Sequence, residues 1–102
     1  MVTEKKKILN EVIEVFMDLQ KERGRAIPEK LTGNMNPFRC LEEFDSYTGL
    51  VATVRLCRAF GIQIEPGLNL CVFEENGIKK GRSFNQITEE IIRILEIKNQ
   101  YD

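Results

Sequence analysis

Ser46 is the residue best placed for chemistry in this chain, because it follows an acidic residue, Asp45, at the start of an amphipathic run. About one helix length later the run ends in a Phe-Gly-Ile-x-Ile sequence, residues 60–64. A serine at the start of a helix either caps the free backbone N–H groups or displays its hydroxyl for modification. From the local sequence alone both roles stay open for Ser46.

Histidine is absent from the 102 residues, which limits the chemistry that the chain can perform alone. Ser-His-Asp and Cys-His arrangements are excluded. A carboxylate pair or a Ser-Lys arrangement stays open, although no spacing points to one. The three cysteines are widely spaced and form no C-x-x-C pair. We therefore expect reduced, mostly buried thiols and no metal site.

The composition is that of one folded domain covering residues 1–102, since 42% of the residues are apolar and 30% are charged. A net charge of −1 offers no general attraction for nucleic acid or anionic lipid. No segment approaches the roughly 20 apolar residues of a membrane span. The basic start, residues 1–7, leads into a helical pattern with acidic residues and not into an apolar signal region. We therefore expect a cytoplasmic protein.

Three segments have the periodicity of amphipathic helices. The first covers about residues 3–23, and the second begins at Asp45 and Ser46 and stops at Gly61. The third opens at residues 83–86 with the S-x-x-Q form of a capping box. Gly49 lies inside the second helix, which indicates either the close approach of another group or simple tolerance.

The connections are less regular. Residues 25–43 contain turn residues and scattered apolar anchors, which predict a long loop packed on the core with one short helical turn. Residues 68–77 fit either a short helix or a strand that enters a hairpin at Asn76-Gly77, and we favour the short helix. Residues 79–82 are read as a basic loop. The predicted fold is all-α, a small bundle of three main helices plus a short helix, with a long first loop.

The chain resembles the acyl carrier proteins, the phosphopantetheine-binding carrier domains. The resemblance rests on Asp45-Ser46, the amphipathic helix after them and the exit at residues 60–64, with no gap between serine and exit. The order of the helices and the long first loop agree with that family, so the resemblance covers most of the chain.

In that family a separate transferase attaches 4′-phosphopantetheine from coenzyme A to the serine, and the thiol of this arm holds acyl groups as thioesters. The resemblance implies Ser46 as the attachment residue and Asp45 as the acidic neighbour recognised by the phosphopantetheinyl transferase. It also implies a monomeric carrier without catalytic activity, which serves acyl-activating, condensing or acyltransferase enzymes. Residues on the second helix would contact these partners: Tyr47, Leu50, Arg55 and Arg58.

Several positions depart from the family pattern. The second helix carries Arg55 and Arg58 and no acidic residue after Asp45, whereas family members are acidic there. Tyr47 replaces an aliphatic residue, and the segment between the exit and Ser83 is longer than usual. These departures favour a specialised lipid or secondary-metabolite pathway over housekeeping fatty-acid synthesis.

Two other interpretations stay open. Ser46 could be an unmodified helix cap in a carrier-like bundle that acts as a protein-interaction module. A helical nucleic-acid-binding domain would instead use basic residues, but the net charge and their scattered positions argue against it. These residues are Lys5, Lys6, Lys7, Arg23, Arg25, Lys79, Lys80 and Arg82.

Overall fold

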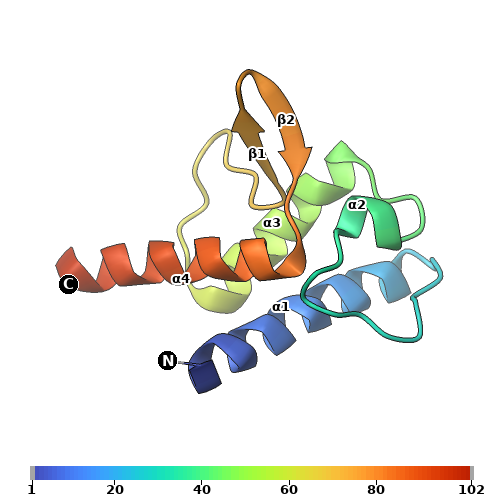
Figure 1. Cartoon of the computed structure of the whole chain (residues 1–102), viewed down its shortest axis with the longest axis horizontal. Coiled ribbons are helices and arrows are strands. Elements are labelled where there is room, and N and C mark those ends of the chain that lie inside the picture. The colour runs from blue at the N-terminus through green and yellow to red at the C-terminus, as the bar shows by residue number, and fades with distance from the viewer. Residues whose placement is uncertain (1, 102) are drawn as a thin grey trace.

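Three long helices, one short helix and a β-hairpin make up the described part of the chain, which is residues 2–101, with side chains from residue 4 to residue 97. The computed structural model has the element order α1, α2, α3, β1, β2, α4 (Figure 1). Their bounds are Val2–Glu22 for α1, Pro37–Cys40 for α2, Ser46–Phe60 for α3, Val72–Glu75 for β1, Ile78–Gly81 for β2 and Phe84–Tyr101 for α4. None of the helices in this part of the chain is long and apolar enough to cross a bilayer.

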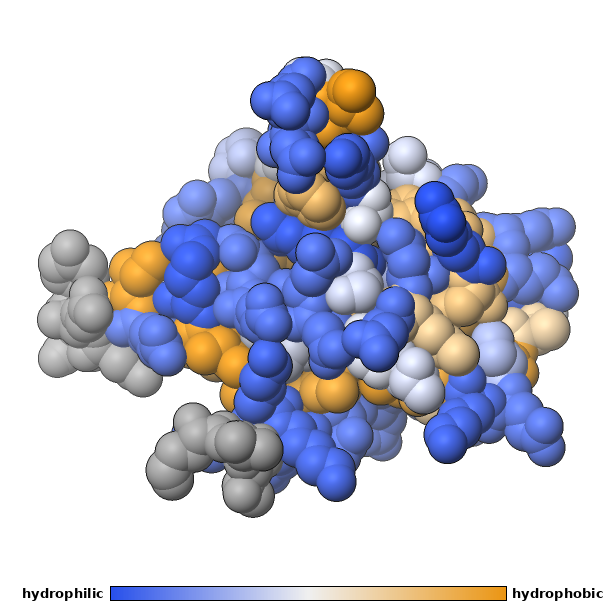
Figure 2. All heavy atoms as spheres, viewed as in Figure 1, coloured by the Kyte–Doolittle hydropathy of each residue, from blue (hydrophilic) through white to orange (hydrophobic). Residues whose placement is uncertain are grey.

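The long helix α1 is the base on which the two other long helices, α3 and α4, pack. Its apolar stripe, with Val12, Phe16 and Leu19 all buried, recurs at three- and four-residue steps. α1 contacts both α3 and α4. Figure 1 shows the hairpin standing on the side of the molecule away from α1, above α3 and the start of α4. The hairpin is therefore an addition to a helical base, and Figure 2 shows it projecting from the surface with mostly hydrophilic residues in view.

The prediction of an all-α fold is wrong. β1 and β2 pair antiparallel, from Val72 opposite Gly81 to Glu75 opposite Ile78, so the fold is mixed α/β. Residues 72–75, favoured above as part of a short helix, are a strand, and the predicted basic loop contributes Lys79 and Lys80 to β2.

Turn chemistry explains why the hairpin forms. Asn76 and Gly77 have φ values of 53° and 78°, and a two-residue hairpin turn that matches strand twist needs positive φ at both positions. Val72 and Phe73 are a β-branched and an aromatic residue, the types that strands favour. The ten-residue window 68–77 is also too short for a helix to gain much from its own hydrogen bonds.

Residues 25–43 form the long connection expected from the sequence, with α2 as its short helical turn. Pro37 opens α2, and the Asn36 side chain caps it by accepting a hydrogen bond from the backbone N–H of Phe38 at 2.9 Å. The Phe38 ring meets Phe44 edge-on at a centroid distance of 5.2 Å. Phe44 in turn packs against Phe16 of α1. The aromatic contacts thus anchor the loop to the core immediately before α3.

Thr53 of α3 ties the entry of the hairpin to the helix. Its side chain is buried, donates a hydrogen bond to the carbonyl of Gly49 at 2.9 Å and accepts one from the backbone N–H of Leu70 at 3.0 Å. Leu70 lies just before β1 and is fully buried. This backbone N–H therefore depends on one hydroxyl oxygen for its partner.

We expect Thr53→Val to lower the free energy of unfolding by about 1–3 kcal/mol, because the shape is kept while the buried N–H of Leu70 loses its acceptor. Thr53→Ser is the matched control, since it keeps the oxygen and loses only a methyl group. Urea denaturation followed by circular dichroism measures both. A valine variant at least as stable as the serine variant would contradict the assignment.

Candidate functional site

The start of α3 holds the two residues that the sequence analysis singled out, and the structure gives them different tasks. Asp45 is the N-cap, with extended backbone and a carboxylate that accepts from the backbone N–H of Thr48 at 2.9 Å and from its hydroxyl at 2.8 Å. Ser46 is the first helical residue. The cap of α3 is therefore Asp45, and the interpretation of Ser46 as a mere cap loses its physical basis.

The side-chain hydroxyl of Ser46 does not take part in the hydrogen bonds that hold the start of α3. Ser46 is exposed, and its side chain makes no hydrogen bond to any other described residue. It borders a hollow of about 250 Å³, whose other walls come from α2, the β1 entry and β2. We call this space the Ser46 hollow; it is lined by Phe38, Ser46, Asn69, Val72, Lys79, Lys80 and Gly81. Figure 1 shows β2 descending beside the first turn of α3, in agreement with this lining.

Gly49 allows the three elements around the serine to come close together. A Cβ atom on Gly49 would lie 3.3 Å from the Phe38 ring and 3.5 Å from Cβ of Cys71. These contacts bring α2 and the β1 entry onto the first turn of α3. Of the two explanations for a glycine in this helix, close approach is the one the structure supports.

The charges around Ser46 are mixed. Hydrogen bonds from the backbone and then from the hydroxyl of Thr48 hold the pKa of the Asp45 carboxyl below its usual value, so this group stays anionic at neutral pH. Lys79 and Lys80 reach the hollow from β2. Lys80 also pairs with Glu75 across the hairpin at 3.2 Å. An anionic group attached at Ser46 would therefore meet helix N–H groups and lysine ammonium groups.

Catalysis by Ser46 itself has little support in this geometry. The lining of the Ser46 hollow includes no carboxylate that could take the proton of the hydroxyl. Its lysines are exposed, whereas a lysine that activates a serine is a desolvated one. Cys71 contributes no nucleophile either, because burial raises the pKa of its thiol to about 12. None of the residues that line the Ser46 hollow is therefore placed to activate the serine hydroxyl.

The four expected partner-contact residues all lie on α3, but they differ in their distance from Ser46 and in the contacts they already make. Tyr47 and Leu50 lie beside Ser46, and these residues are 73% and 46% exposed. Arg58 is exposed, but about 18 Å of helix separates it from Ser46. Arg55 donates two hydrogen bonds to the carboxylate of Glu22 on α1, one of them at 3.1 Å to Oε1. The Arg55 guanidinium thus joins two helices, and its hydrogen bonds lower the pKa of Glu22.

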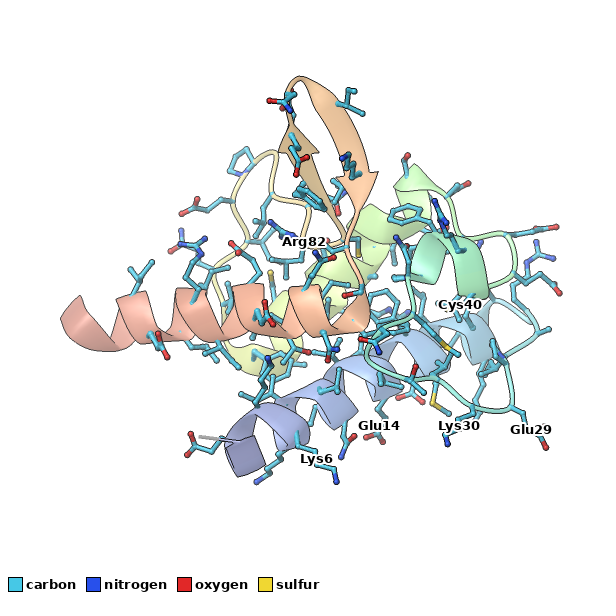
Figure 3. The ribbon with its side chains drawn as sticks, in the orientation of Figure 1. Lys6, Glu14, Glu29, Lys30, Cys40 and Arg82 are labelled. Carbon is cyan, nitrogen blue, oxygen red and sulfur yellow. The ribbon has the colours of Figure 1, made fainter. Side chains whose placement is uncertain are left out.

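Several of the basic residues considered above for nucleic-acid binding already have partners inside the molecule. Lys5 pairs with Glu89 at 3.0 Å and Arg25 pairs with Glu43 at 2.6 Å. Arg82 lies between the hairpin and α4 in Figure 3, with its guanidinium 5.9 Å from the centre of the Phe73 ring. Lys5, Arg25 and Arg82 thus make contacts within the molecule, whereas Lys79 and Lys80 lie together beside the Ser46 hollow.

Sequence reasoning missed the contribution of β2 to the site. Lys79 and Lys80 were read as part of a loop, although the Asn76-Gly77 turn was visible in the sequence and would have placed them on the return strand. Asn69 was missed as well, because its position depends on the packing of the β1 entry against Gly49. The position of Asp45 and Ser46 at a helix start could be predicted from the local sequence, whereas the opposite wall of the Ser46 hollow could not.

Comparisons of the chain with protein-family models, with curated proteins and with solved structures found no match. The function is therefore inferred from the residues and their geometry.

Proposed function

We propose that this protein is a carrier of acyl groups, which it holds as thioesters on a 4′-phosphopantetheine arm attached to Ser46. The observation that carries the proposal is the exposed Ser46 hydroxyl, which makes no hydrogen bond to other described residues while its neighbour Asp45 caps α3. The resemblance of residues 45–64 to the acyl carrier proteins supports the same assignment, although the hairpin departs from the all-α fold that the resemblance implied.

Attachment of the arm needs a partner, a phosphopantetheinyl transferase. The Ser46 hydroxyl oxygen attacks the pantetheine-bearing phosphorus of coenzyme A and forms a new P–O bond. The bond to the second phosphate breaks, adenosine 3′,5′-bisphosphate leaves, and a base on the transferase takes the hydroxyl proton. Asp45 is exposed beside the reacting oxygen and anionic at neutral pH, so it can help the transferase to bind its metal ion.

The product suits its position on the protein. The phosphodiester carries a negative charge at the first turn of a 15-residue helix, where free N–H groups and the helix dipole favour an anion. The flexible arm raises the effective concentration of the cargo at any enzyme that docks on the carrier. Catalysis then belongs to the partners, which we expect to be acyl-activating, condensing or acyltransferase enzymes.

Partner enzymes would dock on the surface next to Ser46. Tyr47 and Leu50 are large exposed apolar side chains there, and such residues commonly anchor interfaces. Arg58 is available farther along α3, whereas Arg55 is engaged with Glu22. We further propose that the carrier is a monomer in the cytoplasm and that it serves a specialised lipid or secondary-metabolite pathway.

Intact-mass spectrometry tests the proposal. Incubation with coenzyme A, magnesium and a broad-specificity phosphopantetheinyl transferase is expected to add the mass of one arm. Tandem mass spectrometry of the peptides should place it on Ser46, and the serine at position 83 should stay unmodified. No added mass with several transferases, including those of the source organism, would reject the carrier assignment. The exposed Tyr47 and Leu50 would then belong to an unmodified protein-interaction module.

A further inference from the structure

A second hollow, of about 930 Å³, lies beside the Ser46 hollow, between the hairpin and the loop that carries α2. We call it the hairpin groove. The two spaces share Phe38 and the β2 residues 79–81 as a common wall. Gly81 allows the end of β2 to lie directly against Asn36 and Phe38. A Cβ atom on Gly81 would lie 2.8 Å from the Phe38 ring and 2.7 Å from Nδ2 of Asn36. An arm attached to Ser46 therefore starts next to this groove.

The side-chain amides of the groove present donors. The amide oxygen of Asn34 accepts from Asn85 at 3.2 Å, that of Asn36 from the backbone of Phe38 at 2.9 Å, and that of Gln86 from the backbone of Ser83 at 2.8 Å. Each oxygen is thus used inside the protein. The three NH₂ groups make no hydrogen bond to other described residues. The free hydrogen-bonding capacity of these amides is consequently for acceptors.

The charges of the groove are of one sign. Its lining includes Arg39, Lys79 and Lys80 and no aspartate or glutamate. Lys80 pairs with Glu75 at the edge of the hairpin. Neither Arg39 nor Lys79 forms an ion pair among the described residues, and the nearest acidic neighbour of Lys79 in the hairpin register is Glu74, opposite it on β1. Two exposed cations therefore border a hollow that also offers amide donors and the rings of Phe38 and Phe73.

We propose that the hairpin groove binds the cargo of the arm and that this cargo is an acyl group ending in a carboxylate. The proposal rests on the carrier function of Ser46. The amide NH₂ groups of Asn34, Asn36 and Gln86 would donate to the carbonyl oxygens of the arm and thioester. The cargo carboxylate would pair with Arg39 and Lys79. A neutral acyl chain cannot form an ion pair with Arg39 or Lys79. Charge complementarity therefore favours an anionic cargo over a neutral one.

Loading the protein with adipyl or hexanoyl coenzyme A compares two cargoes of equal length that differ in the terminal carboxylate. With ¹⁵N-labelled protein, NMR should show larger shifts of the side-chain NH₂ signals of Asn34, Asn36 and Gln86 with adipyl cargo than with hexanoyl cargo, because the carboxylate holds the arm in the groove. Hydrolysis of the adipyl thioester should slow by about two- to fivefold relative to the hexanoyl thioester, as partly exposed ion pairs allow. Each rate is divided by that of the same thioester on free pantetheine, which removes intrinsic reactivity.

A double charge reversal, Arg39→Glu with Lys79→Glu, should remove the difference between the two cargoes. The matched control is Lys6→Glu with Lys30→Glu, at exposed lysines that line neither hollow and lie well away from the hairpin in Figure 3. This control should keep the difference. Circular dichroism checks that both variants stay folded.

The outcomes separate this inference from the carrier assignment. If no transferase can load Ser46, both the carrier assignment and the cargo assignment are rejected. If loading succeeds but the two cargoes behave alike, only the cargo assignment is overturned. If the reversal variant loads normally and discriminates as well as the wild type, the cations serve a partner protein and the groove is not the cargo site.

Discussion

Ser46→Ala is expected to abolish the gain of mass completely while leaving the free energy of unfolding within about 0.5 kcal/mol of the wild type. The hydroxyl makes no hydrogen bond to other described residues, and Asp45 keeps the cap of α3 in the variant. Alanine is also a favourable residue in the first turn of a helix. The variant therefore separates modification from folding, which most substitutions at a helix start cannot do.

Ser83→Ala provides the matched control at the start of α4. Ser83 accepts from the backbone N–H of Gln86 at 3.2 Å, and its own N–H donates to the Gln86 side chain at 2.8 Å. Loss of this reciprocal cap should cost about 1 kcal/mol of stability and leave the modification unchanged. Mass spectrometry and urea denaturation on both variants give the comparison. A Ser46→Ala protein that still gains one arm would place the attachment elsewhere.

The helices of this fold are predictable because their signals are local. Apolar residues recur at helical steps in α1, α3 and α4, and the stop at Gly61 adopts the left-handed conformation that ends many helices, with φ of 67°. The Asp45 and Ser46 pair belongs to the same class, since a cap and the residue after it are set by neighbouring N–H groups. The sequence left open which of the two was the cap.

The hairpin was predicted wrongly because its apolar run fits both a short helix and a strand. Leu70, Val72 and Phe73 fit a short buried helix as well as a strand, and periodicity cannot separate the two over so few residues. The decision lies with Asn76 and Gly77, whose positive φ values reverse the chain. A greater weight on this dipeptide would have given the right fold class.

The far side of the site could not be read from the sequence, because it depends on packing between distant segments. Lys79 approaches Ser46 only because Gly49 and Gly81 let α2 and the hairpin close on α3. The pairing of Arg55 with Glu22 likewise depends on how α1 crosses α3. A local pattern is enough to propose Ser46 as an attachment point, whereas tertiary contacts decide which cations lie unpaired near it.

Among the substitutions considered above, Phe16→Ala should lower the free energy of unfolding the most, by about 3–5 kcal/mol. The ring is fully buried on α1 and lies 5.6 Å from the ring of Phe44 and 5.1 Å from that of Phe84, measured between centroids. It therefore joins α1 to the segment before Ser46 and to the start of α4. Its loss opens a cavity where these three parts of the core meet.

Phe16→Leu is the matched control, since it retains most of the apolar volume and should cost less than about 1.5 kcal/mol. Urea denaturation followed by circular dichroism measures both variants against the wild type. Because Phe44 directly precedes Asp45 in the chain, loosening the Phe16 contact should also slow the attachment of the arm in the alanine variant under conditions where it remains folded. Equal stabilities of the two variants would show that the aromatic contacts do not anchor the start of α3.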